Sequence, residues 1–90
     1  MSYLQLIENA KDIYVNDRFL EIKEHKWFGK YSYFLRYSVP DYTNIIEINF
    51  WEGTNNVNVV PLVIDNWIFD ITKQLQEYFS LLGFNIKKWI

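Results

Sequence analysis

Four runs of alternating polar and apolar residues decide the fold of this chain: FLEIKEHKW at 19–27, YSYFLRYSV at 31–39, IIEINFWE at 45–52 and VNVVPLVI at 57–64. A period of two is typical of a strand that buries one face of a sheet. The turn residues Gly29-Lys30 and 53–56 separate the runs into hairpins, and Pro40-Asp41 opens a loop between the second and third runs. Pro61 has no backbone N–H, so the fourth run is expected at a sheet edge or to bend at its middle.

A helix is predicted on each side of the four runs. Ser2 and Gln5 have the spacing of a capping box, and apolar residues then recur with helical periodicity, so residues 3–13 are predicted to be helical and Asn16 to end the helix. After the fourth run, Asp65 or Asn66 can cap a second helix. Its apolar positions recur at spacings of three and four: Ile68, Ile71, Leu75, Phe79 and Leu82.

The end of the second helix is also marked. Gly83 stands where a left-handed C-cap residue belongs, and Phe84 can make the apolar contact that accompanies it. The tail 85–90 can then add a strand or pack Trp89 and Ile90 onto the core.

These elements predict a single α+β domain over residues 1–90. Its order is an N-terminal helix, a four-stranded antiparallel β-meander and a C-terminal helix, with both helices packed on one sheet face. An antiparallel sheet commonly buries one face and leaves the other in water. The buried face is predicted to carry Leu20, Ile22, Tyr33, Leu35, Tyr37, Ile46, Ile48 and Phe50.

The composition favours recognition over chemistry. Eighteen of the ninety residues are aromatic, whereas the chain has one histidine and no cysteine. His25 lies in a run of charged residues, which predicts a solvated side chain and not a catalytic base. Carboxylates such as Glu21 and Glu47 are expected to pair with Lys23 and Arg36. No enzymatic activity, cofactor or metal site is therefore predicted.

Charge and hydropathy limit the classes of partner. The net charge of −2 and the absence of a basic block argue against binding of duplex DNA. No segment has the length and apolarity of a membrane span, so no membrane partner is predicted. Because neither a signal peptide nor disulfide-forming cysteines are visible, a cytoplasmic location is expected.

The residue usage also suggests a source. Ile, Asn, Lys, Tyr and Phe, which have A/T-rich codons, make up 41 residues, against 8 for Ala, Gly, Pro and Arg. This bias indicates an A/T-rich genome and is compatible with a virus or other mobile element, in which case the location is the host cytoplasm.

The second sheet face carries the candidate binding residues. By alternation it presents Glu21, Lys23, His25, Trp27, Ser32, Phe34, Arg36, Glu47, Asn49 and Trp51. Aromatic side chains within a polar surface often mark interfaces. The predicted partner-binding residues are Trp27, Phe34, Arg36, Asn49 and Trp51. The alternative is structural: a register slip would turn some of them inward, and cross-strand aromatic pairs stabilise a sheet without any partner.

The first functional hypothesis is a small non-enzymatic protein-binding module. It is expected to be a homodimer and to act as an inhibitor or adaptor of a host complex. The second hypothesis is a single-stranded nucleic-acid binder that stacks bases on the same aromatic face. The third is a structural subunit of a larger assembly.

Overall fold

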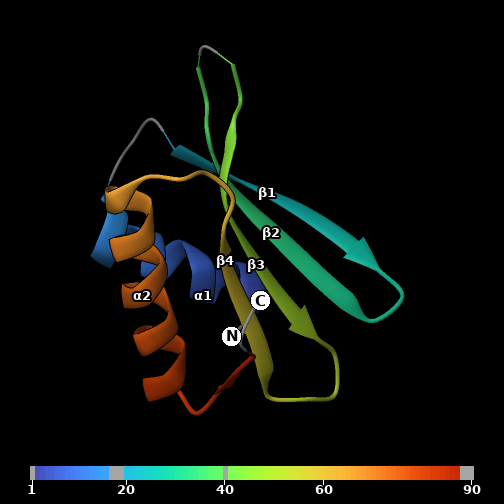
Figure 1. The fold of residues 1–90 in the computed structure, drawn as a ribbon. Helices are drawn as coiled ribbons and strands as arrows, with labels where there is room; N and C mark the ends of the chain where they lie inside the picture. Colours follow the sequence, from blue (N-terminus) through green and yellow to red (C-terminus); the bar gives the residue numbers. More distant parts are fainter. Residues whose placement is uncertain (1, 17–19, 40, 88–90) are drawn as a thin grey trace.

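The computed structural model describes residues 2–16, 20–39 and 41–87 and confirms the α+β class (Figure 1). Its helical elements are α1 (Tyr3–Ala10), a π-helical turn η1 (Lys11–Val15) and α2 (Asn66–Leu81). Its strands are β1 (Leu20–Trp27), β2 (Lys30–Tyr37), β3 (Asn44–Trp51), β4 (Asn56–Pro61) and β5 (Asn85–Ile86).

The first four strands form the predicted antiparallel meander, and their order in the sheet is their order in the chain. The prediction of a four-stranded sheet is one strand too few, because Asn85 and Ile86 pair in parallel with Asn56 and Val57. Gly83, at φ +98°, reverses the chain after α2 and so directs it along β4. Trp89 and Ile90, the other candidates for packing from the tail, lie outside the described residues.

Both predicted helix N-termini are capped by the expected side chains. The Ser2 hydroxyl accepts a hydrogen bond from the backbone N–H of Gln5 at 3.1 Å. The Asp65 carboxylate accepts from the backbone N–H groups of Trp67 and Ile68 at 2.8 and 3.2 Å. These bonds satisfy N–H groups that have no partner within the first turn, and so they fix where each helix begins.

Residues 3–13 are helical as predicted, but the α-helix ends at Ala10 and the helical segment continues to Val15. The chain widens into η1, which a hydrogen bond from the Asn16 N–H to the Lys11 carbonyl closes at 2.7 Å. Asn16 is left-handed (φ +49°) and ends the helical segment, as expected. The wider turn accompanies a contact between helices, in which the Tyr14 ring centroid lies 5.6 Å from that of Tyr78 on α2.

The strand boundaries differ from the predicted ones by a few residues. Trp27 pairs with Lys30, so the first hairpin turn is Phe28-Gly29 and not Gly29-Lys30. A register shift beside Leu35 and Arg36 turns Ile45 into the core, although simple alternation places it on the opposite face. Phe19, the predicted start of the first run, and Pro40, predicted to open the loop after the second run, lie outside the described residues.

Pro61 is the last residue of β4, which borders only the two-residue strand β5 on its outer side. This is the edge position that its missing N–H group predicts.

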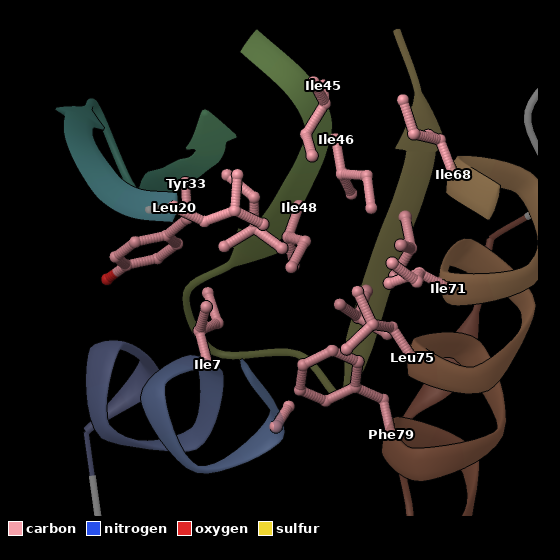
Figure 2. Close-up of a cluster of buried hydrophobic side chains, with 14 of the residues drawn as sticks. Ile7, Leu20, Tyr33, Ile45, Ile46, Ile48, Ile68, Ile71, Leu75 and Phe79 are labelled. Carbon is pink, nitrogen blue, oxygen red and sulfur yellow. The ribbon is translucent and has the colours of Figure 1, made fainter. Parts of the chain in front are cut away.

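The core lies between the sheet and the two helices (Figure 2). The predicted buried face is confirmed, with Ile22 and Tyr37 only half-buried. Phe50 is at its centre: its ring stacks on Tyr3 of α1 at 4.3 Å between centroids and meets Phe79 of α2 edge-on at 5.6 Å. One side chain of β3 therefore joins both helices to the sheet.

Candidate interaction surface

The face of the sheet opposite the helices is the candidate interaction surface, and we call it the open face. Its residues follow from the strand pairing, because residues directly opposite one another in antiparallel strands point to the same side. All five predicted partner-binding residues lie on it: Trp27, Phe34, Arg36, Asn49 and Trp51. They differ in accessibility, and these differences divide the open face into three zones.

The centre of the open face is a closed polar network. Asn49 is only 4 % exposed. Its carbonyl oxygen accepts from the Ser32 hydroxyl at 2.6 Å, and its Nδ2 donates to the Glu47 carboxylate and to the Asn58 carbonyl oxygen, each at 3.0 Å. Asn49 therefore ties β2, β3 and β4 together beneath the surface, so it supports the face instead of offering free hydrogen-bonding groups to a partner.

Arg36, near one end of the open face, is also held by neighbouring side chains. Its Nε donates to the Glu21 carboxylate at 2.6 Å, and its guanidinium carbon lies 5.2 Å from the centroid of the Tyr42 ring. The prediction that Glu21 takes part in an ordinary salt bridge is confirmed. Because its charge is already paired, Arg36 is poorly placed to contact a phosphate group.

Phe34 is half-buried in the middle of β2, and the rings of Phe34 and His25 meet edge-on at 5.8 Å. This contact fits the structural alternative for Phe34, in which a cross-strand pair stabilises the sheet.

The opposite end of the open face is aromatic and exposed, and we call Trp27, Phe28, Lys30 and Trp51 the hairpin end. Trp27 is 71 % exposed and Phe28 is 95 % exposed, and their ring centroids are 5.2 Å apart. Trp51 is half-buried, and the Lys30 ammonium lies 5.7 Å from its ring centroid. The hairpin end is thus an aromatic surface with a lysine at its middle.

Phe28 has an unfavourable backbone conformation. Its φ of +40° is followed by +80° at Gly29, so both central residues of the turn are left-handed. Such two-residue turns favour Asn-Gly or Gly-Gly, because a bulky side chain at positive φ costs about 1–2 kcal/mol. The turn is nevertheless fixed in place, since the Gly29 carbonyl accepts from the backbone N–H of Glu52 at 2.7 Å.

Phe28 is not among the predicted binding residues, because the turn was predicted one residue later, at Gly29-Lys30. A signal was present: in the tripeptide Trp27-Phe28-Gly29, a two-residue turn that ends on the glycine makes Phe28 its first central residue.

A hollow of about 490 Å³ opens beside Trp51, lined also by Thr54, Asn56, Asn58 and Lys87. Its lining combines the aromatic side chain of Trp51 with the hydroxyl-bearing Thr54 and the amide-bearing Asn56 and Asn58. The hairpin end therefore offers a projecting aromatic side chain, Phe28, and a depression next to Trp51.

Tyr33 lies on the buried face, and no pattern in the sequence predicts its polar contact there. Its hydroxyl donates to the Glu24 carboxylate at 2.6 Å. Burial, and then this hydrogen bond, raise the pKa of the Tyr33 phenol well above its ordinary value. The phenol therefore stays protonated in the folded chain at a pH at which the unfolded chain ionises.

We expect this difference to appear as alkaline instability. Above about pH 10 the unfolded chain releases the Tyr33 proton and the folded chain does not, so the free energy of unfolding falls as pH rises. In Tyr33→Phe this fall should be shallower, at the cost of about 1 kcal/mol at neutral pH for the lost hydrogen bond. Urea unfolding between pH 7 and 11 measures both effects. Tyr42→Phe, at an exposed loop position, is the control, and equal slopes in the two variants would contradict the assignment.

Two further findings concern chemistry and membranes. Among residues 2–16, 20–39 and 41–87, no three His, Cys, Asp or Glu side chains lie close enough together to hold a metal ion. Within the same residues, no helix has the length and apolarity needed to cross a membrane.

No known protein family, curated protein or solved structure matches the chain. A function must therefore be inferred from the geometry of the open face and of the hairpin end.

Proposed function

We propose that this chain is a non-enzymatic protein-binding module and that the hairpin end is its contact surface. The observation that supports this most is Phe28, which is 95 % exposed in a backbone conformation that disfavours it. The Phe28 ring contacts Trp27 but remains almost fully in water, so burial in the monomer does not compensate for the backbone strain, and such strain concentrates at functional positions. A partner that buries the Phe28 ring would gain binding energy from it, and this accounts for the strained conformation.

The make-up of the hairpin end also fits a protein partner. Protein interfaces are enriched in aromatic residues at their centre and are polar at their rim. Buried Trp side chains are frequent energetic anchors, each contributing about 2 kcal/mol or more in favourable cases. Trp27 and Phe28 supply anchors, Lys30 supplies a charged group beside them, and the hollow beside Trp51 supplies a concave surface. The turn is held by the Glu52 N–H, so little ordering is needed on binding.

Within this proposal, the module acts by occupying a surface of its partner, as an inhibitor or adaptor does. The A/T-rich residue usage supports an origin in a virus or mobile element, for which a host complex is the partner.

Phe28→Asn separates binding from folding. It creates the Asn-Gly turn that two left-handed residues favour, so we expect the free energy of unfolding to rise by about 1 kcal/mol. The same change removes the aromatic anchor, so we expect retention of the partner to fall at least about tenfold, as for an interface hot spot. Thermal unfolding measures the first effect, and quantitative mass spectrometry of proteins retained on immobilised wild type and variant measures the second.

Two comparison variants make the result specific. Trp27→Ala should lose the same protein, whereas Leu81→Asn should keep it, because Leu81 is also an exposed apolar residue (85 %) but lies at the end of α2. A set of retained proteins that is identical for wild type and Phe28→Asn would contradict the proposal.

Single-stranded nucleic acid is the second candidate partner, favoured by the Lys30 ammonium over the Trp51 ring at the hairpin end. Bases can stack on exposed tryptophans while lysines contact phosphates. The paired state of Arg36 and the carboxylates of Glu21 and Glu47 weigh against it. Titrating a mixed-sequence single-stranded oligonucleotide while following Trp fluorescence tests it: saturable quenching that weakens with salt would favour nucleic acid over protein.

A further inference from the structure

The outer half of β1 is exposed on both of its sides. From Lys23 to Trp27 every residue is exposed, whereas Leu20 is buried and Glu21 and Ile22 are half-buried. In Figure 1 the β1–β2 hairpin extends away from both helices, and the start of α1, with its cap Ser2 and Tyr3, borders a hollow that Glu24 and Lys26 also line. β1 is also the first strand of the sheet, so its outer edge pairs with no other described strand.

The free edge presents backbone groups at known positions. Trp27 and Lys30 flank a two-residue turn, which makes them a hydrogen-bonded pair. Hydrogen-bonded and non-bonded pairs alternate along an antiparallel ladder, so the N–H and C=O groups of Ile22, Glu24 and Lys26 are directed to the outer edge. Another strand can hydrogen-bond to these groups.

The side chains of this segment limit which strand can pair there. Charged residues on an edge strand usually prevent pairing, because an arbitrary strand leaves them unmatched. Here their signs vary along the strand as Lys23, Glu24, His25, Lys26. A second copy of the same segment, running antiparallel, can match them.

In a symmetric dimer whose two-fold axis is perpendicular to the sheet, the two β1 strands run antiparallel and residues that point to the same face lie opposite each other. The axis passes beside one residue, which lies opposite its own copy, and this residue defines the register. Centring on Lys23 or on Glu24 opposes two like charges directly. Centring on Ile22 opposes Glu21 to Lys23, but Glu21 is already paired with Arg36; this register also opposes Leu20 to Glu24 and uses the half of β1 that borders α1 and η1. In the register centred on His25, Glu24 of each copy lies opposite Lys26 of the other copy, and Lys23 of each copy lies opposite Trp27 of the other copy.

We propose that a second copy of this chain pairs with β1 in antiparallel orientation, in the two-fold register centred on His25. This register uses the exposed segment Lys23–Trp27 from end to end, and it opposes His25 to its own copy but no lysine to lysine and no glutamate to glutamate. The two sheets become one, with both open faces on the same side and the hairpin ends near the two-fold axis. The pairing goes beyond the proposed function, because it depends on the edge of β1 and not on the identity of any other partner.

Charge exchange tests both the pairing and its register. Glu24→Lys alone or Lys26→Glu alone opposes like charges twice in each dimer, so each should weaken dimerisation at least about tenfold. The double exchange restores opposite charges and should recover the wild-type dimer. Mixing the two single variants should give a heterodimer, because each supplies the charge that the other needs. Sedimentation equilibrium over a concentration series, up to about the millimolar range in which weak dimers form, measures all four.

Controls separate loss of pairing from loss of folding. Glu24→Lys also removes the acceptor of the Tyr33 hydroxyl, so each variant is first shown by thermal unfolding to be folded. Lys73→Glu makes the same charge change as Lys26→Glu at an exposed position of α2 and should leave the dimer unchanged. Wild type that stays monomeric throughout the series would overturn the proposal. So would a dimer that both single exchanges leave intact, or one that the double exchange and the mixture fail to restore.

Discussion

Replacing Phe50 by alanine is expected to lower the free energy of unfolding by about 3–5 kcal/mol, the usual range for a large aromatic residue removed from a core. Phe50 is fully buried, and its ring contacts Tyr3 of α1, Tyr33 of β2, and Phe79 and Phe84 around the end of α2. The cavity left behind would therefore border both helices and the sheet at once, and these elements cannot all move to fill it.

Phe34→Ala is the matched control for this prediction. Phe34 lies on the neighbouring strand β2 but points to the open face, where it is half-buried. Its removal should cost about 1 kcal/mol, the order of a cross-strand aromatic contact. Urea unfolding followed by circular dichroism measures both variants. Similar losses for Phe34 and Phe50 would mean that the assignment of faces is wrong. Since small domains have only about 5–15 kcal/mol of stability in total, Phe50→Ala should remove a large share of it and lower the unfolding temperature clearly.

Asn49→Asp is expected to cost about 3 kcal/mol at neutral pH, although the two side chains have nearly the same shape. The Asn49 Nδ2 donates to Glu47 and to the Asn58 carbonyl oxygen. A carboxylate in its place has no hydrogen to donate and lies buried beside the carboxylate of Glu47. The network therefore changes from satisfied to repulsive.

The pH dependence of this loss identifies its cause. Burial and the neighbouring carboxylate raise the pKa of the introduced carboxyl in the folded chain above its value of about 4 in the unfolded chain. The difference in stability between variant and wild type should therefore be small at about pH 4 and grow as pH rises toward 7. Asn44→Asp is the control, because Asn44 is an exposed residue of the same strand. A loss that does not depend on pH would point to packing and not to charge.

Much of the fold could be predicted from the sequence because the signals are local. The capping side chains of Ser2 and Asp65, the left-handed Gly83 and the edge position of Pro61 each depend on a few neighbouring residues. The candidate site could be predicted only in part. Alternation identified the open face, but it could not distinguish Asn49, which is buried in a network, from Trp27, which is exposed.

The reason for that limit is that the network joins residues far apart in the chain. Ser32 and Asn49 are 17 positions apart, and Asn49 and Asn58 are 9 apart, and only the registers of β2, β3 and β4 bring them into line. The register in turn depends on turn geometry, and a turn placed one residue too late hides the strain at Phe28. The pairing of the parallel strand β5 with β4 likewise depends on where the end of α2 lies relative to the sheet.

Local sequence signals were sufficient to predict the buried face of the sheet (except at Ile45), the starts of both helices, and a chain rich in aromatic contact surface. These properties follow from backbone periodicity and from hydrogen bonds within one or two turns. Which aromatic residues are accessible depends on the tertiary structure. The helices cover one face and leave the outer half of β1 uncovered, and the accessibility of a side chain depends on the packing of elements that are distant in the chain.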